Sequence, residues 1–222
     1  DLIAQGWRVP DTDPYSHTMP DWHWVEHAWL TDGVLALIYR GMGPFGGLGL
    51  IGFFGGVTAL AWWIAARLAP VNRTYRLAAL VASLWVALPF LGARTQLISL
   101  LGVAIVLLTW TRIQRGQRQW VWALPPLFLL WANLHGGFTA GLFVATVLLS
   151  LSFLMKIGIE WKICQASRDE PVLTWDDLCR WTIAIVVSVA VTCLNPYGWR
   201  LYIEIYESLT DRFMIDTLRE WQ

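Results

Sequence analysis

The chain has 222 residues, of which 56% are hydrophobic and only 14% are charged. Soluble domains carry about 25% charged residues, so this composition excludes an ordinary soluble domain and indicates a membrane protein. The 16 basic and 16 acidic side chains give no net charge, which offers no attraction for nucleic acid. Three scattered cysteines, Cys164, Cys179 and Cys193, lack metal-ligand spacing and do not suit a disulfide framework.

The first 32 residues are polar, aromatic and acidic, and prolines interrupt them. Two Asp-rich turns in this segment predict a loop rather than a regular element. Pro20-Asp21 then predicts the start of a helix from Trp22 to about Arg40. Its tryptophans place that helix at the membrane interface. Residues 1–45 are therefore expected to form one outer unit, a loop followed by an interfacial helix.

Five uncharged runs follow and predict six transmembrane helices, because a span needs about 20 mostly apolar residues and the longest run holds two spans. The expected spans are 45–66, 77–93, 95–111, 119–134, 137–155 and 181–195. The expected fold is all-α, a polytopic helical membrane protein in which residues 46–222 form one transmembrane core. Pro125-Pro126 is expected to kink the fourth span, and Gly52-x-x-x-Gly56 predicts close helix contact in the first.

The longest uncharged stretch, residues 119–155, holds two of these spans and one polar interruption. Trp131-Ala132-Asn133-Leu134-His135-Gly136-Gly137 is poor material for the centre of a lipid-facing helix. It therefore predicts the tip of a helical hairpin at the membrane surface. Two interpretations stay open. Either Asn133 and the glycines only make the turn, or His135 belongs to a site at that surface.

Basic residues give the orientation of the spans. Ten of the 16 lie in the segments 67–76, 112–118 and 156–180, which alternate with the segments on the other side. The positive-inside rule makes these three segments cytoplasmic. Residues 1–45 then lie outside, which in a bacterium is the periplasmic side of the inner membrane.

In this orientation the unusual polar groups gather on the outer face. They are Asp11, Asp13 and His17 in the loop, His23, Glu26 and His27 in the interfacial helix, Arg94-Thr95-Gln96 between spans two and three, Asn133 and His135 at the hairpin tip, and Asn195 with Arg200 after span six. Convergence of carboxylates, imidazoles and arginines on one face predicts a site for an anionic substrate reached from the outer leaflet. For a single residue such as Arg94, the alternative is a snorkelling side chain without a ligand.

Several of these segments carry a resemblance to a known family. Asp11-Thr12-Asp13-Pro14-Tyr15-Ser16-His17-Thr18 and His27-Ala28-Trp29-Leu30 resemble the first outer loop of bacterial GT-C-type integral membrane glycosyltransferase-like proteins. Four later segments are similar to segments of that group and occur in the same order. They are Arg94-Thr95-Gln96-Leu97-Ile98-Ser99, Trp131-Ala132-Asn133-Leu134-His135-Gly136-Gly137, Asn195-Pro196-Tyr197-Gly198 and Glu220-Trp221-Gln222. The resemblance implies one further span upstream and more downstream.

The resemblance has two departures. Ala28 stands where the group usually carries a Glu after the His, so any role of that Glu falls to the neighbouring Glu26 or is lost. Thr95 replaces the usual Pro. Because Ala28 removes an acid, a non-catalytic relative of the family, or a lipid-binding subunit, is an alternative. Transport is a poorer fit, since the spans have almost no polar residues at the midplane.

The chemistry implied by the resemblance is sugar transfer from a polyprenyl-phosphate donor to an acceptor hydroxyl at the outer leaflet. That reaction needs a carboxylate to take the acceptor proton and positive groups beside the lipid phosphate. We expect Asp13 to be the base, with Asp11 second. The expected substrate-binding residues are Arg94 and Arg200 for the phosphate, His135 as a supporting donor, and His27, Glu26 and Asn133 around them. Asp11 and Asp13 could instead bind a divalent cation or form a turn before Pro14.

A rival reaction class comes from His23-Trp24-Val25-Glu26-His27, which fits the His-x-x-Glu-His pattern of some zinc proteases. On a helix, His23 and His27 lie one turn apart and could share a metal ion, with Glu26 nearby. A working site of that kind also needs a third protein ligand and a soluble catalytic domain, and the sequence offers neither. No metal site is therefore assigned.

Overall fold

The structure is a computed structural model that describes residues 25–68, 72–87, 94–163 and 172–210, with residues 6, 9, 12, 17, 23 and 92 as isolated positions. The helices are α1 (Trp29–Gly41), the 3-10 helix η1 (Gly43–Phe45), α2 (Gly46–Leu68), α3 (Arg73–Ala87), α4 (Gln96–Gln114), the 3-10 helix η3 (Arg118–Ala123), α5 (Leu124–Leu134), α6 (Phe138–Glu160), α7 (Trp175–Thr192) and α8 (Arg200–Thr210). The extended structure in this part of the chain is one isolated bridge between Thr12 and His23. The all-α prediction is confirmed.

Among the described residues, three helices are long and apolar enough to cross a membrane: Gly43–Leu68, Gln96–Gln114 and Phe138–Glu160. They match the expected first, third and fifth spans. The other three expected spans correspond to shorter or more charged helices. α3 has 15 residues, which is about 22 Å at 1.5 Å per residue, against a hydrocarbon core of about 30 Å.

The expected fourth span is interrupted in a different way from the predicted kink. The polypeptide forms the 3-10 helix η3 first, and α5 begins at Leu124 with Pro125 and Pro126 in its first turn. The first turn of an α-helix needs no hydrogen bond from these backbone nitrogens. The prolines therefore start a helix of 11 residues rather than bend a longer one.

The sixth expected span also begins earlier than its uncharged run. Thr174 caps α7 by accepting a hydrogen bond from the Asp177 backbone N–H (3.2 Å), and the Asp177 carboxylate accepts one from the Thr174 N–H (3.0 Å). Asp177 also pairs with Arg118 Nε at 2.8 Å. Polar and charged residues thus hold the first turn, and the apolar part of α7 continues from there.

The core is built around Trp131 of α5. Its ring stacks on Phe128 with the centroids 5.6 Å apart. A methyl group added at Gly102 of α4 or at Gly141 of α6 would collide with the Trp131 ring. Only glycine at these two positions allows α4 and α6 to close on both sides of the indole.

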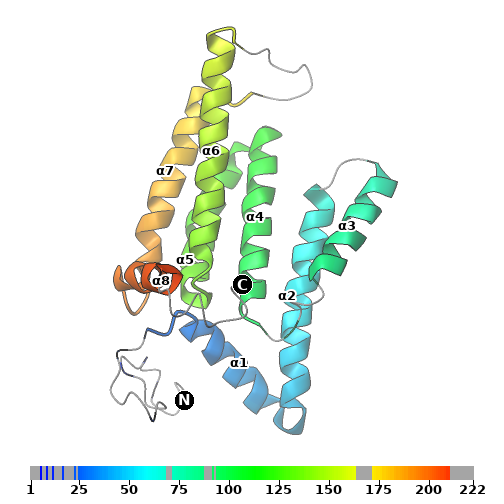
Figure 1. The fold of residues 1–222 in the computed structure, drawn as a ribbon, viewed down its shortest axis with the longest axis vertical. Helices are drawn as coiled ribbons and strands as arrows, with labels where there is room; N and C mark the ends of the chain where they lie inside the picture. The colour runs from blue at the N-terminus through cyan, green and yellow to red at the C-terminus, as the bar shows by residue number, and fades with distance from the viewer. Residues whose placement is uncertain are drawn as a thin grey trace.

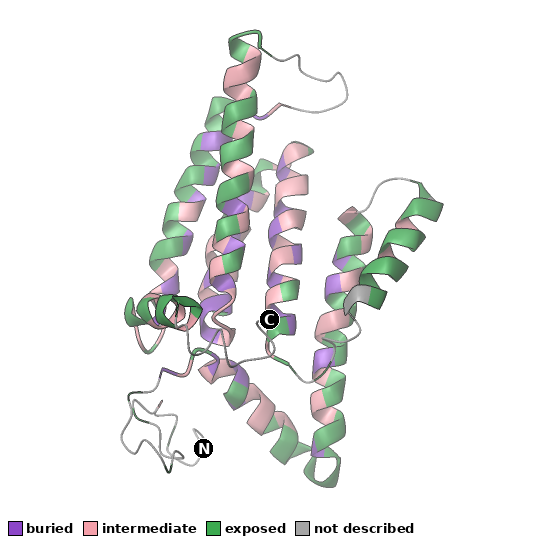
Figure 2. Cartoon of the chain, viewed as in Figure 1, coloured by how far each residue is buried: buried purple, intermediate pink, exposed green. Residues whose placement is uncertain are grey.

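Figure 1 shows α2, α4 and α6 running lengthwise through the molecule, with α1 and α8 lying across one end. That end also holds the α5–α6 turn and the first turn of α4. The opposite end holds the α4–η3 turn, the C-terminal end of α6 and the N-terminal end of α7. Figure 2 shows α3 and α8 exposed along most of their length, while α5 is largely buried. The connections between consecutive helices thus alternate between the two ends of the bundle (Figure 1), while the side of a membrane on which each end lies stays a prediction.

Candidate functional site

The turn between α5 and α6 is the centre of the candidate site. α5 ends at Leu134, His135 is extended with φ −165° and ψ 140°, and α6 begins at Phe138. A side chain at Gly137 would collide with the Ser99 hydroxyl and crowd His135 Nδ1. Gly136 packs against His27, whose Cδ2 atom lies 3.4 Å from the place a Cβ would occupy. The predicted turn between two helices is confirmed, its place at the membrane surface stays a prediction, and the glycines let two other elements approach the turn.

His135 is held by hydrogen bonds to a single ring nitrogen. The Gly137 backbone N–H donates to His135 Nδ1 at 3.1 Å, and Ser99 Oγ lies 2.8 Å from the same atom. Ser99 Oγ in turn accepts the Trp131 Nε1–H at 3.1 Å. Since Nδ1 accepts a backbone N–H, the neutral ring carries its proton on Nε2. The tip therefore presents an Nε2–H donor.

Burial and, to a smaller extent, the nearby His27 lower the pKa of His135 to about 4. The imidazole is therefore neutral at neutral pH. The two histidine rings meet edge to face, with centroids 5.9 Å apart. His135 can donate one hydrogen bond to an anion, but it does not supply a positive charge.

Asn133, at the end of α5, joins three helices. Its side-chain NH₂ group donates to Leu129 O at 2.8 Å and to Leu194 O at 3.2 Å. Its Oδ1 accepts the Trp29 Nε1–H at 3.0 Å. Asn133 is 8% exposed, so these bonds make it an anchor for α1 and for the end of α7. Its expected contact with substrate stays a prediction.

The segment before α1 approaches the hairpin tip in a non-helical conformation. The expected helix from Trp22 to Arg40 is wrong at its start, because α1 begins at Trp29. Glu26 Oε1 accepts the Ala28 N–H at 3.1 Å, and the Glu26 N–H donates to the Tyr197 hydroxyl at 2.9 Å. These contacts hold the segment away from a helical path and place His27 over Gly136.

This conformation removes the geometric premise of the zinc pattern. His23 lies in the bridge with Thr12, so His23 and His27 are not one helical turn apart. Across the part of the chain that the structure describes, no three His, Cys, Asp or Glu side chains are grouped to hold a metal ion. The helical reading of His-x-x-Glu-His is therefore wrong.

Asp32 is a residue that the sequence prediction missed. It lies in the first turn of α1. Desolvation and the neighbouring Glu26 raise the pKa of Asp32 to about 6, while His27 opposes that shift. The sequence offers one indication of it, since Asp32 is the one acidic residue between Trp29 and Gly41. Glu26, His27, Asp32 and His135 thus form one electrostatically coupled group.

The two candidate arginines lie at this end of the molecule. Arg94 immediately precedes α4, where its carbonyl accepts the Leu97 N–H at 3.2 Å. Arg200 is the first residue of α8, and both side chains are exposed. The expected bases Asp11 and Asp13 lie outside the described residues, so their predicted role stays a prediction.

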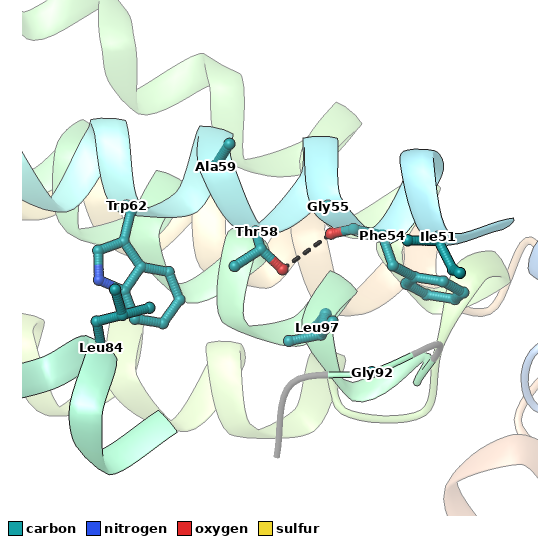
Figure 3. A pocket seen from close by; sticks show the side chains of 9 residues that line it. All are labelled: Ile51, Phe54, Gly55, Thr58, Ala59, Trp62, Leu84, Gly92 and Leu97. Atoms are coloured by element: carbon teal, nitrogen blue, oxygen red, sulfur yellow. Dashed lines mark hydrogen bonds between the residues drawn. The ribbon is translucent and has the colours of Figure 1, made fainter. Parts of the chain in front are cut away.

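An apolar groove adjoins this end of α4 (Figure 3). Its cavity volume is about 580 Å³, and it is lined by Ile51, Phe54, Gly55, Thr58, Ala59, Trp62, Leu84, Gly92 and Leu97. The Thr58 hydroxyl donates to Phe54 O at 2.8 Å, so the lining offers little to a polar ligand. Leu97 faces the groove and Ser99, two residues later, bonds His135. The first turn of α4 therefore separates an apolar groove from the polar cluster.

Comparisons of the chain with family models, with curated proteins and with solved structures found no match.

Proposed function

We propose that the chain is a membrane glycosyltransferase-like protein that transfers a sugar from a polyprenyl-phosphate donor to an acceptor at the outer leaflet. The observation that carries this proposal is the arrangement around the first turn of α4. An apolar groove lies on one side of it, the neutral donor of His135 lies on the other, and exposed Arg94 precedes it. An isoprenoid phosphate matches this arrangement, because it consists of an apolar chain that ends in an anionic head.

Each part has a role in this proposal. The groove accepts the isoprenoid chain by burying apolar surface. The Arg94 guanidinium pairs with the phosphate, and His135 Nε2–H adds a neutral hydrogen bond. Arg200 is a second cation at the same end of the fold. Asp13, or failing that Asp11, takes the acceptor proton, as the family resemblance implies.

The membrane arrangement is part of the same proposal. The three shorter helices α3, α5 with η3, and α7 complete six crossings of a bacterial inner membrane. The N-terminal unit, residues 1–45, then lies in the periplasm together with the α5–α6 turn. Support comes from the basic residues, since Arg112, Arg115 and Arg118 lie at the opposite end of the fold.

Donor binding by the protein in lipid nanodiscs tests the proposal. Arg94→Ala should weaken binding of a polyprenyl-phosphate sugar at least tenfold, because one charge-assisted contact is worth about 1.5–3 kcal/mol. Arg94→Lys should restore part of it, since Lys keeps the charge but not the fork of donors. Arg115→Ala, at the other end of α4, is the matched control and should bind as the unmodified chain does. Equal donor binding by all four proteins would contradict the proposal.

Sugar transfer separates the enzyme from its non-catalytic alternative. General-base catalysis is worth about 10²–10⁴ in rate, so Asp13→Asn should lose turnover and keep donor binding. A lipid-binding subunit would bind the donor and transfer no sugar in any variant. The protease alternative predicts one zinc per chain by elemental analysis, lost in both His23→Ala and His27→Ala.

A further inference from the structure

The helix α8 has three distinct faces, although it is only 11 residues long. Leu201, Tyr202 and Ile205 pack against the core. The polar residues Glu204 and Glu207 occupy a second face. At about 100° per residue, the apolar residues Ile203 and Tyr206 lie between these two faces. We call Ile203 and Tyr206, with the preceding Trp199, the outer stripe.

The outer stripe is apolar and uncovered. Trp199 is 66% exposed, Tyr206 68% and Ile203 40%. Monomeric proteins in water rarely expose a continuous row of large apolar side chains. In an amphipathic helix that is surrounded by water, the residues away from the core are mostly polar. Here a row of exposed apolar residues lies beside the polar face instead. Water is therefore a poor solvent for this side of α8.

The orientation of the stripe is fixed by the turn that precedes α8. The Asn195 side chain donates to Thr192 O at 2.7 Å and to Gly198 O at 3.1 Å, and it accepts the Tyr197 N–H at 2.8 Å. Gly198 has φ +59°, a conformation that favours glycine. Beyond the turn, the Tyr202 hydroxyl bonds Thr192 and its ring meets Phe138 edge to face. The stripe thus belongs to a docked helix.

The position of α8 indicates what covers the stripe. α8 lies across the end of the bundle, whereas α6 and α7 run lengthwise (Figure 1). Along α7, exposed apolar side chains such as Val186 and Val189 lead towards exposed Leu194, and Trp199 follows after the turn. An exposed apolar surface along α7 therefore continues onto α8. Trp and Tyr are the residues enriched where such a surface reaches the lipid headgroups.

We infer that α8 is an interfacial helix whose outer stripe is inserted among the lipids of the leaflet that borders the candidate site. The core face then points to the bundle, the outer stripe to the acyl chains, and Glu204 with Glu207 to water. Arg200 is the one basic residue of α8 against these two acids. Attraction to anionic headgroups therefore contributes little, and burial of apolar and aromatic surface holds the helix. This inference rests on the proposed crossing of the membrane by α7, but it does not depend on sugar transfer.

Spin labels on single cysteines in the reconstituted full chain test the inference, with the three native cysteines replaced. Labels at Ile203→Cys and Tyr206→Cys should collide more with oxygen than with a water-soluble nickel complex. Val186→Cys, on the exposed face of α7, is the lipid reference and should behave alike. Glu207→Cys is the matched control on α8 and should show the reverse preference.

The other outcomes overturn the inference. Labels at 203 and 206 that prefer nickel would place the stripe in water. Labels shielded from both reagents would show that a protein partner covers it. The oxygen preference should also be equal in phosphatidylcholine vesicles and in vesicles containing phosphatidylglycerol. A preference that appears only with the anionic lipid would show that charge, rather than the apolar stripe, holds α8.

Discussion

Different kinds of side-chain contact hold the helices together at the two ends of the bundle. At the end that holds the candidate site, neutral groups bond one another: Ser99 with His135, Asn133 with Trp29, and the Thr31 hydroxyl with Leu134 O at 2.6 Å. At the opposite end the contacts include three ion pairs: Arg118–Asp177 at 2.8 Å, Arg180–Asp176 at 2.9 Å and Lys156–Glu160 at 3.3 Å. Charged pairs suit helix ends that are open to water. The neutral network joins α1, α4 and α5 at this end without an ion pair among these hydrogen bonds.

In the proposed topology the two ends lie on opposite sides of the membrane, and labelling of single cysteines tests this with the largest expected effect. In a background without native cysteines, Glu207→Cys should react with a membrane-impermeant thiol reagent added outside intact cells. Asn72→Cys, between α2 and α3, should react only after the cells are opened. Both side chains are exposed, so exposure does not explain the difference. The reverse pattern would invert the orientation and remove the outer site.

The neutral network should be sensitive to the loss of one hydroxyl. Ser99→Ala leaves Trp131 Nε1–H without its acceptor and His135 Nδ1 without one donor, and a buried unsatisfied group costs about 1–3 kcal/mol. Thermal unfolding in detergent should show a clear drop in Tm. Thr109→Val is the matched control on the same helix, because the buried Thr109 hydroxyl has no hydrogen-bond partner. It should leave Tm unchanged or raise it, and equal losses in both variants would contradict the network.

The pH dependence of stability distinguishes the two titrating groups of the site. The folded-state pKa of His135 is lowered from 6.5 to about 4, so the unfolded chain takes up a proton first. This group should therefore reduce stability as pH falls from about 6.5 to 4, by at most about 1.4 kcal/mol per pH unit. His135→Gln should flatten that fall. A Tm profile of the variant identical to the original would show that His135 does not titrate in this way.

Asp32 acts in the opposite direction within part of the same range. Its pKa is raised from 3.8 to about 6, so its ionised form is unfavourable in the fold above about pH 6. As pH falls from 6 towards 3.8, protonation relieves that cost and adds stability. Asp32→Asn should remove this relief and make the acid-side fall in Tm steeper. An unchanged or shallower fall would contradict the assignment.

The smallest effect is expected at an ion pair of the opposite end. Asp176 and Arg180 are one turn apart on α7 with half-exposed side chains. Exposed pairs of this kind contribute about 0–1 kcal/mol, so Asp176→Ala should shift Tm little at low salt and not at all at high salt. A shift as large as that of Ser99→Ala would erase the contrast between the two ends.

Composition and hydropathy predicted the helical class, the three long apolar helices and the hairpin tip, because these depend on local sequence. The start of α1 could not be read in this way. It depends on the Tyr197 hydroxyl, which lies 171 positions away from Glu26 and holds the preceding segment in a turn. The predicted kink at Pro125-Pro126 is wrong because η3 ends just before these prolines. They therefore lie in the first turn of α5 rather than inside a longer helix.

The candidate site shows the same division. Its location at one end follows from the alternation of spans, and His135 follows from its unusual place in an uncharged run. Ser99 and Asp32 were missed because a hydroxyl and a lone acid carry no pattern by themselves. Ser99 gains its role only when α4 lies beside the hairpin, 36 positions along the chain from His135.

The Trp131 contacts impose an order on the biogenesis of the protein. During translation α4 emerges first, with Gly102 and Ser99, then α5 with the indole, and then α6 with Gly141. The short α5 cannot acquire its second glycine face until α6 has been synthesised. We therefore expect α5 and α6 to enter the bilayer as a pair and to close on an α4 that is already in place. His135 acquires its contact with Ser99 only at that closure, so the polar cluster is completed after α5 and α6 have reached α4.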